Sequence, residues 1–587
     1  MAAFSLSLNS PLLPNVDSYI NPVKDEDEHR SALNAVVLNI HRSGAGAFEG
    51  LVTNHMGEYL ANADAKIRER ATLLLAELLA RLPTLPLAAP SAARFAAFFS
   101  SRLGDYPSVV PALKALSGLL KNHSAALLSD SRAGRGGGGA GGRGGEEVGA
   151  AAAATGAKSA AEVIARGVFD ELHLPALSQS IRQAALSVLL ALVSEPGLAE
   201  TLSSGMGREF VTGLVGSLEG EKDPRCLIVG LAALRKTQEV FDAAVLSDTC
   251  EAVFDATACY FPVTFTPPPN DPHNISPDTL RTGLEGVLVG SPGMAAHVLP
   301  MLLDKLASEV PTAKEASLKA LVAGVRAFGP TGVGKHLGAI GGAMFDEAVH
   351  GADPILAALA LVSLTEVARE TASYAVLTGL GEGWACSEWR ALAGPLLERA
   401  VAEVAGPQPC SVLGRGSARV LLALSASSSL GLRSGLALAV PLLLRARKEA
   451  AAAMDRHVAA LRGGSAGGSC GGGGGAEAGG ATTSSGGGRC VGGGGGEEHA
   501  GVATSAVDRE AFDDAQAARL GALAGLMAAV DDKVDFSGSQ GGAPLQPYVS
   551  PLLEEFTAAL EWCGDELAGG GGGTAAVCLA ARGLGTW

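Results

Sequence analysis

Aromatic residues are scarce in this sequence of 587 residues. They make up 4% of the chain, although hydrophobic residues as a whole make up 47%, so the available core residues are mainly Ala, Leu and Val. This composition favours close packing of helices, because sheets prefer aromatic and β-branched side chains. The sequence therefore predicts an all-α protein.

Cysteine motifs, a secretory signal and long apolar runs are also missing. The nine cysteines form no Cys-x-x-Cys pair and have no histidine at metal-ligand spacing, which is typical of free thiols in a reducing compartment. The N-terminus lacks the basic segment of a signal peptide. The longest apolar stretches, 436–444 and 520–530, are shorter than the roughly 20 residues of a membrane helix. We expect an intracellular protein with no membrane partner and no metal site.

Positive charge is in deficit, with 44 Lys and Arg against 60 Asp and Glu and a net charge of −16. Proteins that hold nucleic acid need a basic surface to displace its counterions, and no basic stripe is visible in the sequence. We therefore expect no direct binding of DNA or RNA.

A helical pattern recurs along the chain. Residues 66–78 (KIRERATLLLAEL) align with residues 180–192 (SIRQAALSVLLAL), with Ile-Arg, an alanine and two leucines at matching places. A weaker copy begins at Ala313-Lys314, and residues 353–367 resemble a fourth. Helix pairs of this kind cannot cover their own apolar faces, so neighbours must stack. The pattern predicts an all-α, HEAT-like α–α superhelix, or solenoid; the alternative is ordinary amphipathic helices in a globular bundle.

Glycine tracts interrupt this pattern and read as flexible insertions, because they bury too little apolar surface to offset the entropy of ordering. Arg135 and Arg143 in the first tract stand beside Glu146 and Glu147, so a linker is favoured over an RNA-binding segment. The predicted organisation is a loosely ordered N-terminus (1–30), a HEAT-like domain (31–462) with a Gly-rich insertion at about 133–147, a Gly-rich linker (463–506) and a short helical tail (507–587).

The most distinctive stretch lies between residues 220 and 279. Asp223-Pro224 is a typical helix start, a second helix is expected over about 246–258, and Ser276-Pro277 starts another helix. Between them, the prolines of CYFPVTFTPPPNDPH exclude helix and predict a stiff, polyproline-like arm that its aromatics pin to a helical surface. A docking peptide is the weaker alternative. The candidate site, structural or partner-facing, comprises Tyr260, Phe261, Pro262, Phe265, Pro267, Pro268, Pro269, Asn270, Asp271 and Pro272.

Candidate chemistry is weak throughout. Residues 329–336 (GPTGVGKH) nearly match a phosphate-binding loop, but His336 replaces the Ser or Thr that would hold Mg²⁺, and a helix rather than a strand is expected before it. An inter-helix turn is the favoured interpretation. Both GxSxG matches within 463–471 fall in glycine-rich linker, so they predict no nucleophile. Cys250 and Cys259 are expected to be buried structural thiols. The sequence assigns no catalytic, cofactor-binding or metal-binding residue, and so predicts no enzyme.

Four motifs carry a resemblance: the arm itself, GEKDPR at 220–225, FFSSRLGD at 98–105 and LPMLLDKL at 299–306. Together they resemble the N-terminal domain of the HEAT-repeat scaffold family of cytosolic iron–sulfur assembly and nucleotide excision repair, over roughly residues 30–460. In that family further helical repeats follow toward the C-terminus, whereas this sequence turns glycine-rich after Gly463.

The resemblance implies a non-catalytic scaffold of the cytosolic iron–sulfur targeting complex, without a cofactor of its own. Its partners would be assembly factors and apo-enzymes of DNA repair and replication that await a 4Fe-4S cluster, in the cytoplasm and the nucleus. Such a role links the protein to excision repair, transcription and genome maintenance. Two alternatives stay open: a nuclear-transport-type HEAT adaptor with unrelated cargo, against which the PPPNDP arm argues, and a nucleotide-binding enzyme that uses Lys335.

Overall fold

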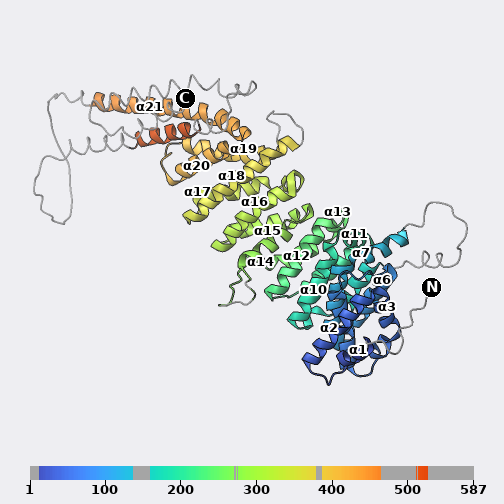
Figure 1. Cartoon of the computed structure of the whole chain (residues 1–587). Helices are drawn as coiled ribbons and strands as arrows, with labels where there is room; N and C mark the ends of the chain where they lie inside the picture. Colours follow the sequence, from blue (N-terminus) through green and yellow to red (C-terminus); the bar gives the residue numbers. More distant parts are fainter. Residues whose placement is uncertain are drawn as a thin grey trace, which may run out of the picture. The chain divides into compact units, whose positions relative to one another are not determined.

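The computed structural model of the chain describes residues 12–135, 159–269, 273, 275–377, 387–464, 511 and 513–526, and every regular element within these ranges is helical (Figure 1). The Gly-rich insertion from residue 136 onward, the Gly-rich linker beyond Gly464 and residues 507–510, 512 and 527–587 of the helical tail lie outside them. The chain divides into two compact units, residues 1–300 and 301–587.

The first unit contains helices that alternate between two layers. Its elements are α1 (Leu12–Ile20), α2 (Glu26–Ser43), α3 (Ala45–Asn54), α4 (Met56–Leu60), α5 (Ala65–Arg81), α6 (Ala89–Arg102), η1 (Tyr106–Ser108), α7 (Val109–Arg135), α9 (Ala160–Glu171), η2 (Leu174–Ala176), α10 (Gln179–Ser194), α11 (Pro196–Leu218), α12 (Pro224–Val240), α13 (Ala243–Ala258), α14 (Pro277–Leu288), η3 (Pro292–Met294) and α15 (Ala295–Ala307), within which the unit boundary falls.

Contacts between alternate helices define the two layers of this unit. Helices α5, α7, α10, α12 and α14 pack one against the next in the first layer, and α6, α9, α11 and α13 do so in the second. Each helix therefore contacts near neighbours in the chain, while no single core gathers all of them. This arrangement is that of an α–α solenoid, and the predicted HEAT-like fold class is confirmed.

The sequence repeat explains how the layer of α5 and α10 is built. Ala71 and Ala185, which the alignment of the two copies matches, are both fully buried. Each has two matched leucines on its buried face, at 75 and 78 in α5 and at 189 and 192 in α10. The small alanine lets the neighbouring helix approach, and leucines at helical spacing fill the seam.

The N-terminal region differs from its prediction. Residues 12–20 form α1, whose Leu12, Val16 and Ile20 are buried against α2 and α5, so loose order is not observed from Leu12 onward. The acidic run that suggested disorder instead starts α2: Asp25 accepts from the amide of Glu28, and the Glu28 side chain reaches back to the amide of Asp25. Carboxylates stabilise a helix start because they satisfy free amides and the macrodipole.

The second unit, taken by itself, also contains helices in two layers (Figure 1). One layer contains α16 (Pro311–Val333), α18 (Pro354–Leu377) and α20 (Val412–Ser427), and the other contains α17 (Leu337–His350), α19 (Ser387–Ala405) and α21 (Ser429–Gly464). Helix α16 carries the third repeat copy, with Ala313, Ser317 and Leu321 buried. The helical part of the tail, residues 513–526, packs on this unit: Arg519 donates to the carbonyl of Gly406 at 2.6 Å, and Leu526 is fully buried.

One stretch of the described chain, residues 429–457 of α21, is long and apolar enough to cross a membrane by length and composition. Two bent helix pairs would also pass if each were one span. The expectation that no apolar segment reaches membrane length is therefore wrong for α21, because the helix continues on both sides of the run at 436–444. Half of the most apolar 18-residue segment of this helix is buried within the protein.

Candidate partner-binding site

The proline arm leaves the helical layers after α13 and returns at α14. Residues 261–268 contain no helix, as the prolines predicted, and Ser276 caps α14 by accepting from the amide of Thr279 at 3.1 Å. Along the arm from Val263 onward, half-buried Val263, Phe265 and Pro267 alternate with exposed residues at 264, 266 and 268. An extended chain turns successive side chains to opposite sides, so one side lies on the protein and the other faces solvent.

Tyr260 fixes the base of the arm. Its hydroxyl donates a hydrogen bond of 2.8 Å to the carbonyl oxygen of Glu221, in the loop that precedes α12. Burial, aided by the neighbouring Cys259 and Glu221, raises the pKa of Tyr260 to about 12. The phenol therefore keeps its proton, and remains a hydrogen-bond donor, throughout the physiological pH range.

Glu221 joins this loop to the repeat before it. Its carboxylate accepts from Arg182 Nε at 2.7 Å and Nη2 at 3.0 Å, and from the amides of Lys222 and Asp223. Burial alone would raise the pKa of Glu221, but the hydrogen bonds from Arg182 and from the two amides outweigh it and hold the pKa below its usual value. Arg182 also donates to the carbonyl of Leu177, so a single guanidinium holds the starts of α10 and α12 together.

Arg225 lies where the arm returns. Its guanidinium donates to the Asp223 carboxylate, with Nη2–Oδ2 at 2.7 Å, and its Nη1 lies 3.2 Å from His273 Nε2. Asp223 also accepts from the amide of Arg225, as predicted for the N-cap of α12. The arm is thus held at both ends, and its exposed edge of Thr264, Thr266 and Pro268 can present backbone and side-chain groups to a partner.

The predicted site residues divide in two. Tyr260, Phe261, Pro262, Phe265 and Pro267 are half-buried, whereas Pro268 and Pro269 are exposed. Asn270, Asp271 and Pro272 lie outside the described residues. The sequence did not predict Glu221, Arg182 or Arg225 as part of this site. Arg182 belongs to the Ile-Arg pair of the sequence repeat, but the repeat gave no indication of its partner.

The near-match to a phosphate loop spans the end of α16 and the turn before α17. Gly329 has φ of +64°, where the chain bends inside α16, and Lys335 is exposed in the turn. The segment before it is helix, so the strand that directs loop amides at a phosphate is not present there. The predicted inter-helix turn is therefore confirmed for residues 334–336, whereas residues 329–333 belong to the bent end of α16.

The cysteines differ from expectation. Cys226 is buried, and burial raises its pKa to about 11, but Cys250 is half-buried and Cys259 is exposed. Buried thiols were thus the wrong prediction for Cys250 and Cys259. The fold also brings Cys250 Sγ to 3.7 Å from His297 Nε2, a pair that no sequence spacing suggested. No cluster of three or more His, Cys, Asp or Glu side chains able to hold a metal occurs in the part of the chain described.

Comparison with known proteins gives one family match. The model of the MMS19 N-terminal family, described as the Dos2-interacting transcription regulator of RNA-Pol-II, matches residues 53–350. This range contains the arm and all of its anchoring residues.

Curated relatives are named MMS19 nucleotide excision repair protein homologs. Similarity to the Dictyostelium discoideum protein is 28% identity over 307 residues, 52% of this chain and 24% of the relative. For the Homo sapiens protein it is 30% over 283 residues, 47% of this chain and 24% of the relative. For the Arabidopsis thaliana protein it is 25% over 338 residues, which are 57% of this chain and 27% of the relative. The matches span about a quarter of the relatives' length.

Solved structures with similar folds include yeast importin-beta (Kap95p), at 11% identity and a TM-score of 0.36, covering 98% of this chain and 61% of that one. An engineered protein matches at 12% identity and a TM-score of 0.34, covering 73% and 94%. The family assignment does not depend on these distant matches, because the family model alone covers more than half of the chain. The chain belongs to the MMS19 N-terminal family.

Proposed function

We propose that the chain is a non-catalytic adaptor that holds protein partners in nucleotide excision repair and iron–sulfur protein maturation. Its partners would be cytosolic iron–sulfur assembly factors and the apo-forms of DNA repair and replication enzymes that receive a 4Fe-4S cluster. We place it in the cytoplasm and the nucleus. The cluster would be cargo delivered to the client enzymes and not a cofactor of this chain.

The observation that carries this proposal is the family match over residues 53–350, together with the name of the relatives, nucleotide excision repair protein homologs. The proposed role in iron–sulfur protein maturation rests in addition on the arm motif at 259–273 and on the three other motifs, whose sequences resemble the same family. Geometry supports an adaptor because each unit consists of helices in two layers, and such layers expose long helix faces suited to binding other proteins.

The anchored arm supports the same conclusion. Tyr260 and Arg225 hold its two ends at fixed places on unit one, while its outer edge remains exposed. A segment held in an extended form before binding loses little conformational entropy when a partner docks on it. The arm is therefore suited to recognition of a protein, and its described residues, 261–269 and 273, form no side-chain arrangement suited to catalysis.

Affinity purification of the full, tagged chain from cells, with quantitative mass spectrometry, tests the proposal. Iron–sulfur assembly proteins and cluster-bearing DNA enzymes should be enriched, and enrichment of the enzymes should rise when iron is chelated, because their apo-forms then accumulate. A matched purification of Thr266→Glu, which changes only the exposed edge of the arm, tests whether the arm contributes. Enrichment of nuclear transport factors in place of these proteins would contradict the proposal.

A nucleotide titration separates an adaptor from an enzyme. Purified chain should bind neither ATP nor GTP, and Lys335→Ala should change nothing in the measurement. Saturable binding that Lys335→Ala abolishes would instead favour a nucleotide-dependent activity at residues 329–336.

A further inference from the structure

A surface groove of about 360 Å³ lies on unit one, and no residue of the arm lines it. It follows α7 between its neighbours α5 and α10, which contact α7 on either side. The residues that line it are Ala80 of α5, Val110, Leu113, Lys114, Ser117, Gly118, Lys121 and Asn122 of α7, and Ala184 and Ser187 of α10.

Small side chains create this groove. Ala80, Gly118 and Ala184 come from three successive helices of one layer, and an added Cβ at Gly118 would meet the backbone of Ala80 at 3.5 Å. Helices that carry small residues at such positions approach closely and leave a hollow above them. Val110, with 55% of its surface exposed, and the buried Leu113 make one end of the hollow apolar.

The groove is positively charged although the chain as a whole is acidic. Lys114 and Lys121 line it, and no Asp or Glu does. Glu77, just outside, is shared between Lys114 Nζ at 2.6 Å and Arg81 Nε at 2.9 Å, so one carboxylate faces two cations. Lys121 is exposed and has no acidic side chain at ion-pair distance among the described residues.

We propose that this groove binds a short acidic segment of a partner protein, which places an apolar side chain over Val110 and Leu113 and carboxylates beside Lys114 and Lys121. From Val110 to Lys121 the groove runs about 17 Å along α7, at about 1.5 Å per residue. That length accommodates roughly five residues of extended peptide. Charge complementarity across the contact orients the segment, and the apolar end supplies burial.

A nucleic acid is a poorer match to the same surface. None of the lining residues is aromatic, so no base can stack there, and two lysines contact too few phosphates for strong binding. The inference goes beyond the proposed function, because it names the chemistry of one binding surface and holds whichever protein supplies the segment.

Fluorescence anisotropy with the full chain tests it. The probe is a fluorescein-labelled synthetic peptide with two leucines set among glutamates and aspartates. We expect saturable binding that weakens as salt rises, because added ions screen surface charge. A peptide with Gln and Asn in place of the acids, and one with Ser in place of the leucines, should each bind several-fold more weakly.

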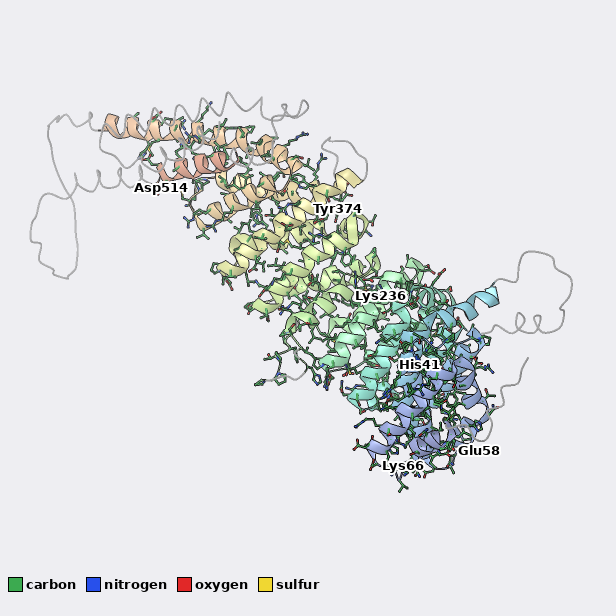
Figure 2. All side chains as sticks on the ribbon, in the orientation of Figure 1. His41, Glu58, Lys66, Lys236, Tyr374 and Asp514 are labelled. Atoms are coloured by element: carbon green, nitrogen blue, oxygen red, sulfur yellow. The ribbon has the colours of Figure 1, made fainter. Side chains whose placement is uncertain are left out.

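Matched variants locate the site. Lys121→Glu should weaken binding about tenfold by replacing attraction with repulsion, and Lys121→Arg should retain it. Val110→Asp should also weaken binding, from the apolar end. Lys66→Glu is the control, since the exposed Lys66 begins α5 (Figure 2) and lies about 20 Å from Ala80 along that helix.

Three results would overturn the proposal. The first is an equal loss with Lys66→Glu and Lys121→Glu, which would mean non-specific attraction. The second is undiminished binding of the uncharged peptide. The third is displacement of the acidic peptide by single-stranded oligothymidine at comparable concentration, which would make the groove a nucleic-acid site. Circular dichroism of each variant shows that a loss reflects the groove and not unfolding.

Discussion

Arg182 donates two hydrogen bonds to Glu221, and the pair joins the first turn of α10 to the loop that starts α12. Arg68 and Asp105 repeat the relationship at the equivalent helix α5, with both contacts at 3.0 Å. Lys314 and Glu347 form a single-contact version in the second unit. In α5 and α10 the arginine therefore binds a carboxylate from the segment that leads into the next helix pair, whereas in α16 the lysine binds a carboxylate of the following helix, α17.

We expect Arg182→Ala to destabilise the protein by about 3 kcal/mol. The side chain of Glu221 is 3% exposed, and removal of one partner of a buried ion pair leaves the other charge without compensation. Two backbone amides still bind Glu221, which keeps the loss at the lower end of the usual range. Urea unfolding followed by circular dichroism measures it. Arg166→Ala, which breaks an exposed pair with Glu209, is the control and should cost at most about 1 kcal/mol.

The depressed pKa of Glu221 predicts a pH dependence of stability. A carboxyl group with a lowered pKa in the folded state stabilises the fold above its unfolded pKa, and the contribution disappears as pH falls through the folded pKa. Glu221→Gln should therefore be less stable than the wild type at neutral pH, and the difference should shrink as pH falls below the ordinary value of 4.5. Urea midpoints between pH 7 and pH 3 check this; a constant difference would contradict it.

Tyr260→Phe should loosen the arm without unfolding its surroundings. The variant keeps the ring but loses the hydroxyl that donates to Glu221, a change worth about 1 kcal/mol. Hydrogen exchange followed by mass spectrometry should show faster exchange in peptides that cover residues 261–269. Tyr106→Phe changes a tyrosine that is 72% exposed and should leave the arm unaffected. Equal exchange in both variants would mean that other contacts hold the arm.

Two glycine substitutions in the second unit should act in opposite directions. Gly329 has φ of +64° and ψ of −174°, a conformation open almost only to glycine, so Gly329→Ala should destabilise the unit by about 1–3 kcal/mol. Gly342 lies within α17 with open space around it, so Gly342→Ala should stabilise the helix by about 0.5–1 kcal/mol. Thermal unfolding compares them. Stabilisation by Gly329→Ala would show that the bend is not required.

Local patterns in the sequence determined much of this protein. Helical spacing of small and apolar residues identified α5 and α10 as copies of one unit, and Asp223-Pro224 and Ser276-Pro277 marked the starts of α12 and α14. Prolines between residues 262 and 269 excluded helix from the arm. Each of these features depends on residues within one or two helical turns of each other, so local sequence is enough to predict it without knowledge of tertiary packing.

Tertiary structure alone decided which distant residues meet. The contacts of Tyr260 with Glu221, of Cys250 with His297 and of Lys114 with Glu77 join residues 37 to 47 positions apart. The order of residues 12–20 and the docking of residues 513–526 also depend on apolar surface that other helices supply. Such pairings follow from the register in which successive helix pairs stack. That register is set by the summed packing of many small side chains, which no short stretch of sequence contains.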